Sequence, residues 1–437
     1  MRFWAAVLLF ASLASAASDP LLDRVRDNIG QRLSQAPDFT CVLEIERSVY
    51  PTATTPRFRT RDRSRLEVSV VDGKELFAWP GDAFEERPLT DLLGPGLAST
   101  GEFSSHGRTT FGDPRTRIER IPEEPAAGLV AYRYWVEAAA SRYVLVTTAG
   151  NVVAAYQGVF HVDRDRAQVV YFEVNLPDPP QASGLASVTS AVRYGEFEVR
   201  GAATWLPANA EIEVVSAQGP AARNQLTFRS CRSFQTETSI SFFSEGEETD
   251  ANELSDSDAD ALPAGLDLNL ELRDAISSDS GWAGDPFRAV LYKNAKTPSG
   301  ETIPKGAEVS GRVVRLETID TTHSVAMKDK VRRMTAVSLK IYEARWEGRC
   351  SPLAATLQLV QRIPQMARAD PGGGAAIGSR NYHSNRASAY ETTAELSDPG
   401  SGTFIIHGEF YLVRKGSRML WKTIAAEPSS CSGADSP

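Results

Sequence analysis

The sequence predicts a mainly β protein: an antiparallel half-barrel with an N-terminal helix, followed by a smaller β-barrel or sandwich domain. Apolar and polar residues alternate with period two from Thr40 to Phe234 and again from Leu266 onward. Helical stretches that would connect parallel strands are largely missing between these segments. The segment 244–261 holds eight acidic and no aromatic residues, so we expect an acidic disordered linker between two domains.

The first residues have the pattern of a signal peptide. Arg2 supplies positive charge, residues 4–13 are apolar, and Ala14 and Ala16 are small residues that suit a signal-peptidase site. We therefore expect residues 1–16 to be removed and the mature protein to be periplasmic or secreted. The apolar run is shorter than the ~20 residues that span a bilayer, and no later run comes close. We expect a protein that does not span the membrane.

The remaining elements follow in order. Residues 20–35 carry apolar side chains at helical spacing, with Asp19 available as N-cap, and predict one amphipathic helix. Strands are predicted at 40–49, 57–71, 129–137, 143–148, 168–176 and 210–216, then in a second series of short strands at 266–272, 287–292, 309–316, 336–342, 356–360, 403–413 and 419–423. We expect the half-barrel over 17–243, the second β domain over 262–427 and a tail over 428–437.

Four cysteines in an exported protein predict two disulfides, for which three connectivities exist. Cys41 and Cys231 lie near the two ends of the first half of the chain, whereas Cys350 and Cys431 both lie in the second half. We expect the pairs Cys41–Cys231 and Cys350–Cys431, each within one domain.

The end of the first domain carries the segments 205–207 (WLP), 211–214 (EIEV) and 223–234 (RNQLTFRSCRSF). Their β-meander pattern resembles that of the closing strands of periplasmic lipoprotein carriers of the LolA/LolB type. An extra loop at 80–114 differs from the pattern of those carriers. The resemblance implies a curved half-barrel around a helix, with an apolar cavity for acyl chains. Residues that share a strand face would then line the concave side, and the candidate ligand-binding residues are Val130, Tyr132, Tyr134, Phe172 and Val174. Core packing against the N-terminal helix is the alternative interpretation.

The second domain opens with 262–265 (LPAG) and continues through 284–291 (GDPFRAVL) and 303–313 (IPKGAEVSGRV). These segments resemble the C-terminal β-domain of TrbI-type conjugation-channel scaffold proteins. The resemblance implies a β fold. The amphipathic insertion that forms the pore in those proteins has no counterpart in this sequence, so a channel role is not implied.

A row of arginines occupies every second position of one predicted strand: Arg57, Arg59, Arg61, Arg63 and Arg65. Their side chains leave the same face, where they could bind anionic lipid head groups or another polyanion. If the preceding strand pairs through a loop at 51–56, however, Glu46 lies opposite Arg61 and Glu44 opposite Arg63. We favour this paired face and keep the anion site as the alternative.

The sequence gives little support for a metal-binding, catalytic or nucleic-acid-binding function. The histidines lack metal-ligand spacing, and the EF-hand-like series from Asp256 has Ala261 where a glycine is needed, so we expect neither metal nor cofactor. No GxSxG motif is present, and no catalytic residue is predicted. The net charge of −9 gives no case for nucleic acid.

The sequence therefore predicts an exported, non-catalytic envelope protein that binds an apolar ligand, a lipid or a lipidated partner. The alternative is a structural or assembly scaffold that contacts other envelope proteins. An exported hydrolase is the third interpretation.

Overall fold

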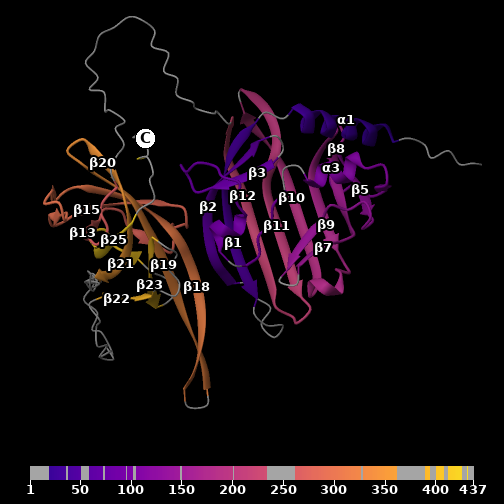
Figure 1. Ribbon diagram of the computed structural model, residues 1–437. Coiled ribbons are helices and arrows are strands. Elements are labelled where there is room, and N and C mark those ends of the chain that lie inside the picture. Colours follow the sequence, from indigo (N-terminus) through magenta and orange to yellow (C-terminus); the bar gives the residue numbers. More distant parts are fainter. Residues whose placement is uncertain are drawn as a thin grey trace, which may run out of the picture.

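The computed structural model describes residues 19–35, 38–50, 59–71, 74–94, 96–101, 105–147, 150–199, 201–233, 261–325, 328–361, 389–393, 400–407, 412–425 and 431. Antiparallel strands dominate this part of the chain, with one long helix at its start (Figure 1). The mainly β class with an N-terminal helix is therefore confirmed. The predicted signal peptide and almost all of the acidic segment and the tail lie outside the described residues. No helix within the described ranges is long and apolar enough to cross a membrane.

The helix α1 (Pro20–Gln35) begins where the sequence predicts. Asp19 caps it, because its carboxylate accepts the backbone N–H of Leu21 at 3.0 Å. Leu22 and Val25 are buried against the sheet and anchor the apolar side of the helix.

The first half is built on neighbouring antiparallel strands whose order differs from the order along the chain. They lie as β4 (Arg117–Ile121), β5 (Leu129–Val136), β8 (Tyr156–Asp163), β9 (Gln168–Leu176), β10 (Leu185–Val199), β11 (Ala202–Ser216), β12 (Ala221–Ser233), β1 (Phe39–Tyr50), β2 (Arg59–Val71) and β3 (Lys74–Ala78). The first strand thus lies inside the sheet, between the last strand of this half and β2. The disulfide Cys41–Cys231 joins β1 to β12, as predicted.

One face of this sheet is covered by α1 and by short helices from the segment 80–114. That segment is predicted to be a loop, but it contains α2 (Leu89–Leu93) and α3 (Ser105–Gly112). The buried leucines of α2 pack around Cys41, and Phe111 of α3 packs on the aromatic side chains of β8 and β9. A separate hairpin follows β5 and consists of β6 (Val144–Thr147) and β7 (Gly150–Val153). A short 3-10 helix, η1 (Gln181–Ser183), precedes β10.

The second half has a core of its own, which includes the fully buried Leu268, Phe287, Phe404 and Trp421. Its strands are β13 (Asp267–Leu272), β14 (Ile276–Ser277), β15 (Pro286–Leu291), β16 (Ala295–Lys296), β17 (Thr302–Ile303), β18 (Glu308–Val325), β19 (Lys328–Trp346), β20 (Arg349–Pro352), β21 (Ala354–Gln361), β22 (Ala389–Thr393), β23 (Ser401–His407), β24 (Leu412–Val413) and β25 (Arg418–Ile424). The sequence predicts short strands, but β18 and β19 form a long hairpin that extends beyond the other strands (Figure 1). The predicted disulfide Cys350–Cys431 is present.

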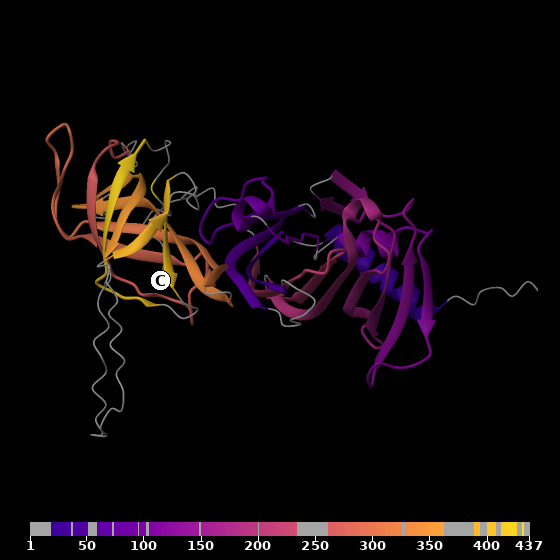
Figure 2. The same cartoon turned by 90° about the horizontal axis from the view of Figure 1, so that it is seen from below.

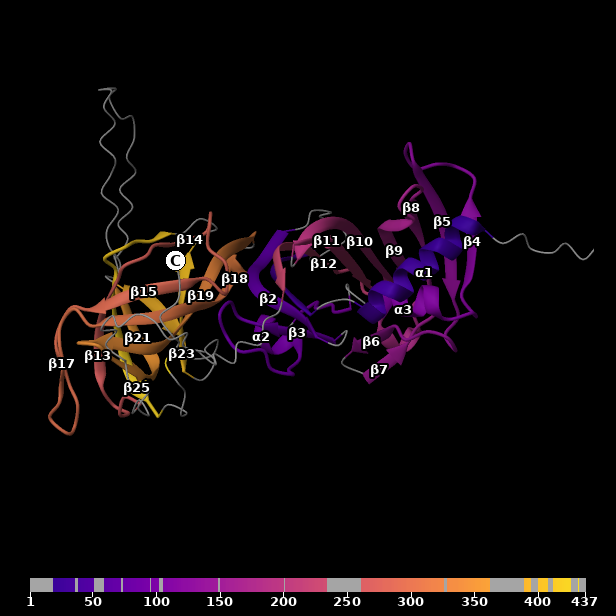
Figure 3. The same cartoon turned by 90° about the horizontal axis from the view of Figure 1, so that it is seen from above.

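The two halves meet along β2 and β18. In the backbone pairing of these two strands, Asp62 of β2 lies opposite Glu317 of β18. Ser64 of β2 also forms an isolated β-bridge with Ala283. Figures 2 and 3 show the orange strands of the second half beside the indigo β2 in both views. The predicted arginine strand therefore lies at the contact between the halves.

Candidate functional site

The described arginines of the row form ion pairs with carboxylates of β1, of β18 and of the loop before β15. Arg61 contacts Glu317 of the second half at 2.7 Å, and Arg63 contacts Glu46 of β1 at 2.8 Å. Arg65 contacts Glu44 at 3.1 Å and also pairs with Asp285 of the second half. Arg57 and the side chain of Arg59 lie outside the described residues. Binding of a polyanion by this row stays a prediction.

The predicted register between β1 and β2 is wrong by two residues. Glu46 lies opposite Arg63 and Glu44 opposite Arg65, whereas the sequence analysis places them opposite Arg61 and Arg63. A β-bulge between Arg47 and Ser48 accounts for one residue of this difference, because Arg47 lies opposite Asp62 whereas Ser48 lies opposite Thr60.

The second half completes the junction with a short loop that precedes β15. The backbone N–H of Arg65 donates to Ala283 at 2.6 Å, and the N–H of Ala283 donates to Arg63 at 3.0 Å. The guanidinium groups of Arg65 and Arg63 lie 5.3 and 5.8 Å from the centroid of the Trp282 ring. Burial raises the pKa of the Asp285 carboxyl above its ordinary value, and the nearby Arg65 opposes that shift. The junction is therefore polar, charged and ordered through backbone hydrogen bonds.

A second ion pair adds to this junction. Arg312 of β18 contacts the Asp82 carboxylate at 2.6 Å and donates to the backbone oxygen of Pro80 at 2.8 Å. Its guanidinium also lies over the ring of Tyr342 at 5.7 Å. Sequence reasoning missed these partners, because no local pattern links residues so distant along the chain.

The candidate ligand-binding residues lie in a packed aromatic core. All five are at most 2% exposed: Val130, Tyr132, Tyr134, Phe172 and Val174. Tyr132 stacks on Phe160 and Tyr134 on Phe172, with ring centroids 5.0 and 5.1 Å apart.

The two tyrosine hydroxyls of this core are satisfied. Tyr132 donates to the Asp19 carboxylate at 2.9 Å, and Tyr134 donates to the backbone oxygen of Glu173 at 2.7 Å. Burial raises the pKa of Tyr134 well above its ordinary value, so the hydroxyl stays protonated. In this conformation the side chains pack on one another and on α1, and binding of an apolar ligand by them stays a prediction.

The opposite face of the same sheet carries a groove of about 590 Å³. Period-two alternation separates the faces: Leu43 and Ile45 point into the core, whereas Glu44 and Glu46 line the groove. The groove runs across β9, β10, β11, β12 and β1, and Trp282 of the second half lines it as well. Its polar and aromatic lining comprises Glu44, Glu46, Tyr171, Arg193, Asn209, Glu211, Gln225, Thr227, Arg229 and Trp282.

Several of the lining side chains order one another. Arg229 contacts Glu44 at 3.0 Å, and Gln225 donates to Glu211 at 3.1 Å. The Arg193 guanidinium lies 5.2 Å from the Tyr171 ring centroid. Burial and a hydrogen bond to Glu173 raise the pKa of Tyr171 to about 12. Apart from Glu44 and Glu46, which are predicted as partners of the arginine row, these positions are marked in the sequence only as the polar alternates of strands, so they are not predicted as a site.

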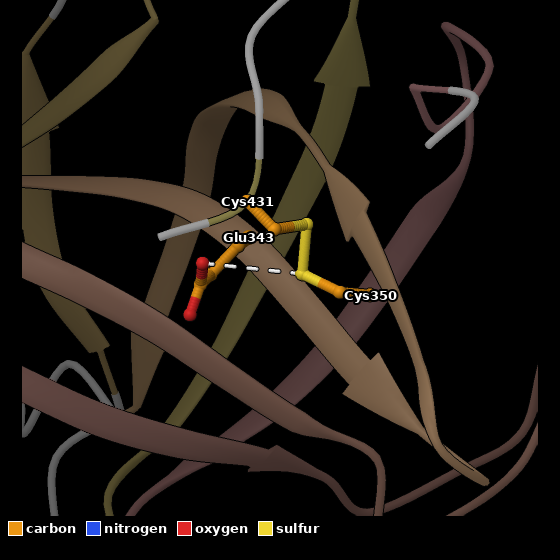
Figure 4. A group of neighbouring side chains, drawn as sticks. All are labelled: Glu343, Cys350 and Cys431. Atoms are coloured by element: carbon orange, nitrogen blue, oxygen red, sulfur yellow. Dashed lines mark hydrogen bonds between the residues drawn. A yellow bond between two sulfur atoms is a disulfide. The ribbon is translucent and has the colours of Figure 1, made fainter. Parts of the chain in front are cut away.

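One further cluster of polar side chains surrounds the second disulfide. Cys350 Sγ lies 4.0 Å from Glu343 Oε2, and Cys431 lies beside them (Figure 4). Both sulfurs are bonded to each other, so the thiolates that a zinc ion prefers are not offered in the oxidised protein. Glu343 instead contacts Arg345 at 3.0 Å. In this form the cluster serves to anchor the chain near Cys431.

Together, the fold and the site define a mainly β protein with two disulfides, which indicate an oxidising environment outside the cytoplasm. No protein-family model matches the chain. No curated protein matches it either. Among solved structures it is similar to a DUF1329 family protein from Desulfovibrio piger, at 9% identity over 52% of this chain and 98% of that chain, with a TM-score of 0.18. Similarity at this TM-score supports no inference about fold or function.

Proposed function

We propose that this is an exported, non-catalytic protein of the cell envelope that acts by binding a partner protein. The disulfides support export, and the sequence carries no catalytic motif. The packed aromatic core supports a scaffold more than a carrier, because the side chains that would hold an acyl chain already contact one another. The observation that carries the proposal is the exposed apolar face of the β6–β7 hairpin.

This hairpin presents valines to solvent. Val144 is 46%, Val146 79% and Val153 48% exposed, and they share one face, because Val144 lies opposite Val153 in the ladder. Leu145, on the other face, is buried in the aromatic core and holds the hairpin on the domain. Exposed apolar side chains gathered on one small element are typical of an interaction surface.

The backbone of the hairpin is suited to strand addition. The N–H of Ala154 donates to Tyr143, so by alternation Leu145–Val152 is also a hydrogen-bonded pair. The backbone groups of Val144 and Val146 then point to the outer edge. Neither strand pairs with a third one among the described residues. An extended segment of a partner with β-branched or other apolar side chains can extend this sheet and cover the valines.

Site-specific crosslinking tests the proposal. A photoreactive residue at position 146 of the full chain, in the cell that produces it, is expected to give one discrete adduct with an envelope protein. Val144→Pro removes an edge N–H without breaking the hairpin and is expected to abolish that adduct. The matched control places the photoreactive residue at Leu412, which is 47% exposed in the second half. Adducts of equal yield at both positions, or an adduct that survives Val144→Pro, would contradict docking at the hairpin.

A second candidate function is binding of an apolar ligand beneath α1. It is favoured by the way in which the helix covers the aromatic face: the contacts include Leu22, Val25 and the hydrogen bond of Tyr132 to Asp19. Withdrawal of the helix would uncover Tyr132, Tyr134 and Phe172. Affinity of the full chain for fatty acids should then rise with acyl length, by about 0.8 kcal/mol per buried methylene. Phe172→Asp should abolish this binding and Val146→Asp should not, and a lack of saturable, length-dependent binding would exclude the carrier.

A further inference from the structure

We propose that the groove across β9, β10, β11, β12 and β1 is a binding site for a neutral oligosaccharide chain. This site lies on the face opposite the aromatic core and is independent of the β6–β7 hairpin.

The dimensions of the groove suit an extended ligand. Its volume of about 590 Å³ lies within the range of about 300–1,000 Å³ that is typical of small-molecule sites. It crosses five adjacent strands, and four interstrand spacings of about 4.8 Å give a length of about 19 Å. A chain of linked rings fits this shape better than a single compact metabolite.

The charges of the lining favour a neutral ligand. Glu44, Glu46 and Glu211 bring three carboxylates, and Arg193 and Arg229 bring two guanidinium groups. A polyanion would meet the carboxylates and a polycation would meet the arginines, so neither has a complementary surface. The lining is also too polar for an acyl chain, because binding would remove hydration from these charged groups without replacing it.

The hydrogen-bonding groups suit hydroxyls, which donate and accept at the same atom. Asn209 and Gln225 offer amides, and Thr227 offers a hydroxyl. The Glu211 carboxylate, already oriented by Gln225, can accept further hydrogen bonds. Arg229 contacts Glu44 through Nε, and its side chain is 63% exposed, so its remaining N–H groups can reach a ligand.

Aromatic rings contribute from two distant parts of the chain. Tyr171 lies on β9, and Trp282 comes from the second half, where it is fixed by Asp285, which accepts its backbone N–H at 2.8 Å. Arg63 and Arg65 lie over the Trp282 ring, and Arg193 and His161 flank the Tyr171 ring. A sugar ring therefore packs its C–H face on the ring surface that these side chains leave uncovered, while its hydroxyls reach neighbouring polar groups. Because Trp282 lies at the junction, the site is complete only when the halves are docked.

Titration of the full-length protein with neutral oligosaccharides tests this inference. The probes are chito-, cello- and malto-oligosaccharides of increasing length, with an unrelated peptide of similar length as comparison, and binding is followed by calorimetry. We expect saturable binding that strengthens with length for at least one series. Trp282→Ala and Tyr171→Ala should each weaken it about tenfold, which corresponds to about 1.4 kcal/mol.

The matched control is Trp135→Ala, which removes an aromatic side chain from β5 outside the groove, beneath Arg117 at 4.7 Å. Its affinity should equal that of the unmodified protein. Tyr171 lies away from the junction, so a loss of binding in Tyr171→Ala cannot be attributed to separation of the halves. Three results would overturn the proposal: no saturable binding of any series, binding unchanged in both groove variants, or binding of the peptide in preference to every oligosaccharide.

Discussion

Arg47 and Asp62 form a buried ion pair across β1 and β2. Arg47 Nε lies 2.6 Å from Asp62 Oδ1 and Nη2 lies 2.9 Å from Oδ2, while Nη2 also donates to the backbone oxygen of Leu93 in α2. Burial raises the pKa of the Asp62 carboxyl even though Arg47 opposes the shift. The pair thus fixes the register of two strands and ties the α2 segment to them.

Removal of one partner should be far more costly than removal of both. Arg47→Met removes the closer of the two arginines that pair with the buried Asp62 carboxylate and leaves only Arg61 at 3.7 Å. It is expected to lower the free energy of unfolding of the first half by about 3 kcal/mol. The double variant Arg47→Met/Asp62→Leu should recover most of this loss, as measured by urea denaturation. As a control, Arg164→Met breaks the exposed pair with Glu124 and should cost at most about 1 kcal/mol. Equal losses in the single and double variants would contradict the assignment.

The contact between the halves should depend on charge. Arg61→Glu is expected to repel Glu317 and increase hydrogen exchange of the 281–285 loop and of β2, because their backbone hydrogen bonds lie beside this pair. The reversed pair Arg61→Glu/Glu317→Arg should restore protection, with a coupling of about 1 kcal/mol for this partly exposed pair. If the reversed pair exchanges as fast as Arg61→Glu, the ion pair does not stabilise the junction.

A glycine permits the close approach of the two halves. A Cβ on Gly284 would lie 2.1 Å from the backbone oxygen of Arg65, and its φ is 105°. Gly284→Ala should therefore displace the loop that carries Trp282 and increase hydrogen exchange at β2. Gly306→Ala has a similar φ of 95° but meets no atom within 4 Å, so it isolates the cost of backbone strain. If hydrogen exchange at β2 increased equally in Gly284→Ala and Gly306→Ala, backbone strain and not the clash with Arg65 would be responsible for the increase.

The first disulfide should contribute more than the second. It closes a separation of 190 residues and the second one of 81, so the chain-entropy relation gives about 5 and about 4.5 kcal/mol. Cys41→Ala/Cys231→Ala should lower the unfolding temperature of the first half, and Cys350→Ala/Cys431→Ala that of the second. Calorimetry of the two double variants measures both unfolding temperatures. If removal of one disulfide lowered only the unfolding temperature of the other half, the two halves would not unfold as separate cores.

Asp113 offers a direct test of local electrostatics. Hydrogen bonds from the side chain and backbone of Arg115 lower the pKa of its carboxyl to about 2 from an ordinary 3.8. Because the folded value is lower, the stabilisation is present above pH 3.8 and is lost as the pH falls through about 2. Carboxyl NMR should show this midpoint, and Arg115→Gln should return it toward the ordinary value. An unchanged midpoint in the variant would exclude the Arg115 side chain as the cause, because the backbone N–H of residue 115 is retained.

Local patterns in the sequence predict the parts of this fold that depend on periodicity. The apolar spacing of α1 matches the burial of Leu22 and Val25, and the strand at 168–176 ends where the alternation ends. The disulfides follow from the placement of two cysteines in each half of the chain. Periodicity could not place α2, because its five residues are too few for a helical pattern and its leucines are held by tertiary packing.

The candidate sites are harder to predict, because they join distant segments. Arg61 and Glu317 are separated by 256 residues, and no periodic pattern relates them. The alternation that marks Tyr171 and Thr227 as outward-facing is the same in any half-exposed sheet, so it cannot show that Trp282 stands beside them. Only the docking of the second half distinguishes this polar face from an ordinary solvated one.

The position of β1 inside the sheet sets the order of folding events. Its neighbour β12 is synthesised only after almost the whole first half. The pairing of Phe39 with Ser233 therefore closes a loop of nearly two hundred residues. Contacts so distant along the chain slow folding. Until residue 233 emerges, β1 lacks one of its two neighbours and the thiols of Cys41 and Cys231 remain apart. Oxidation of this pair therefore marks the completion of the sheet, and a kinetic measurement of disulfide formation reports when the first half has folded.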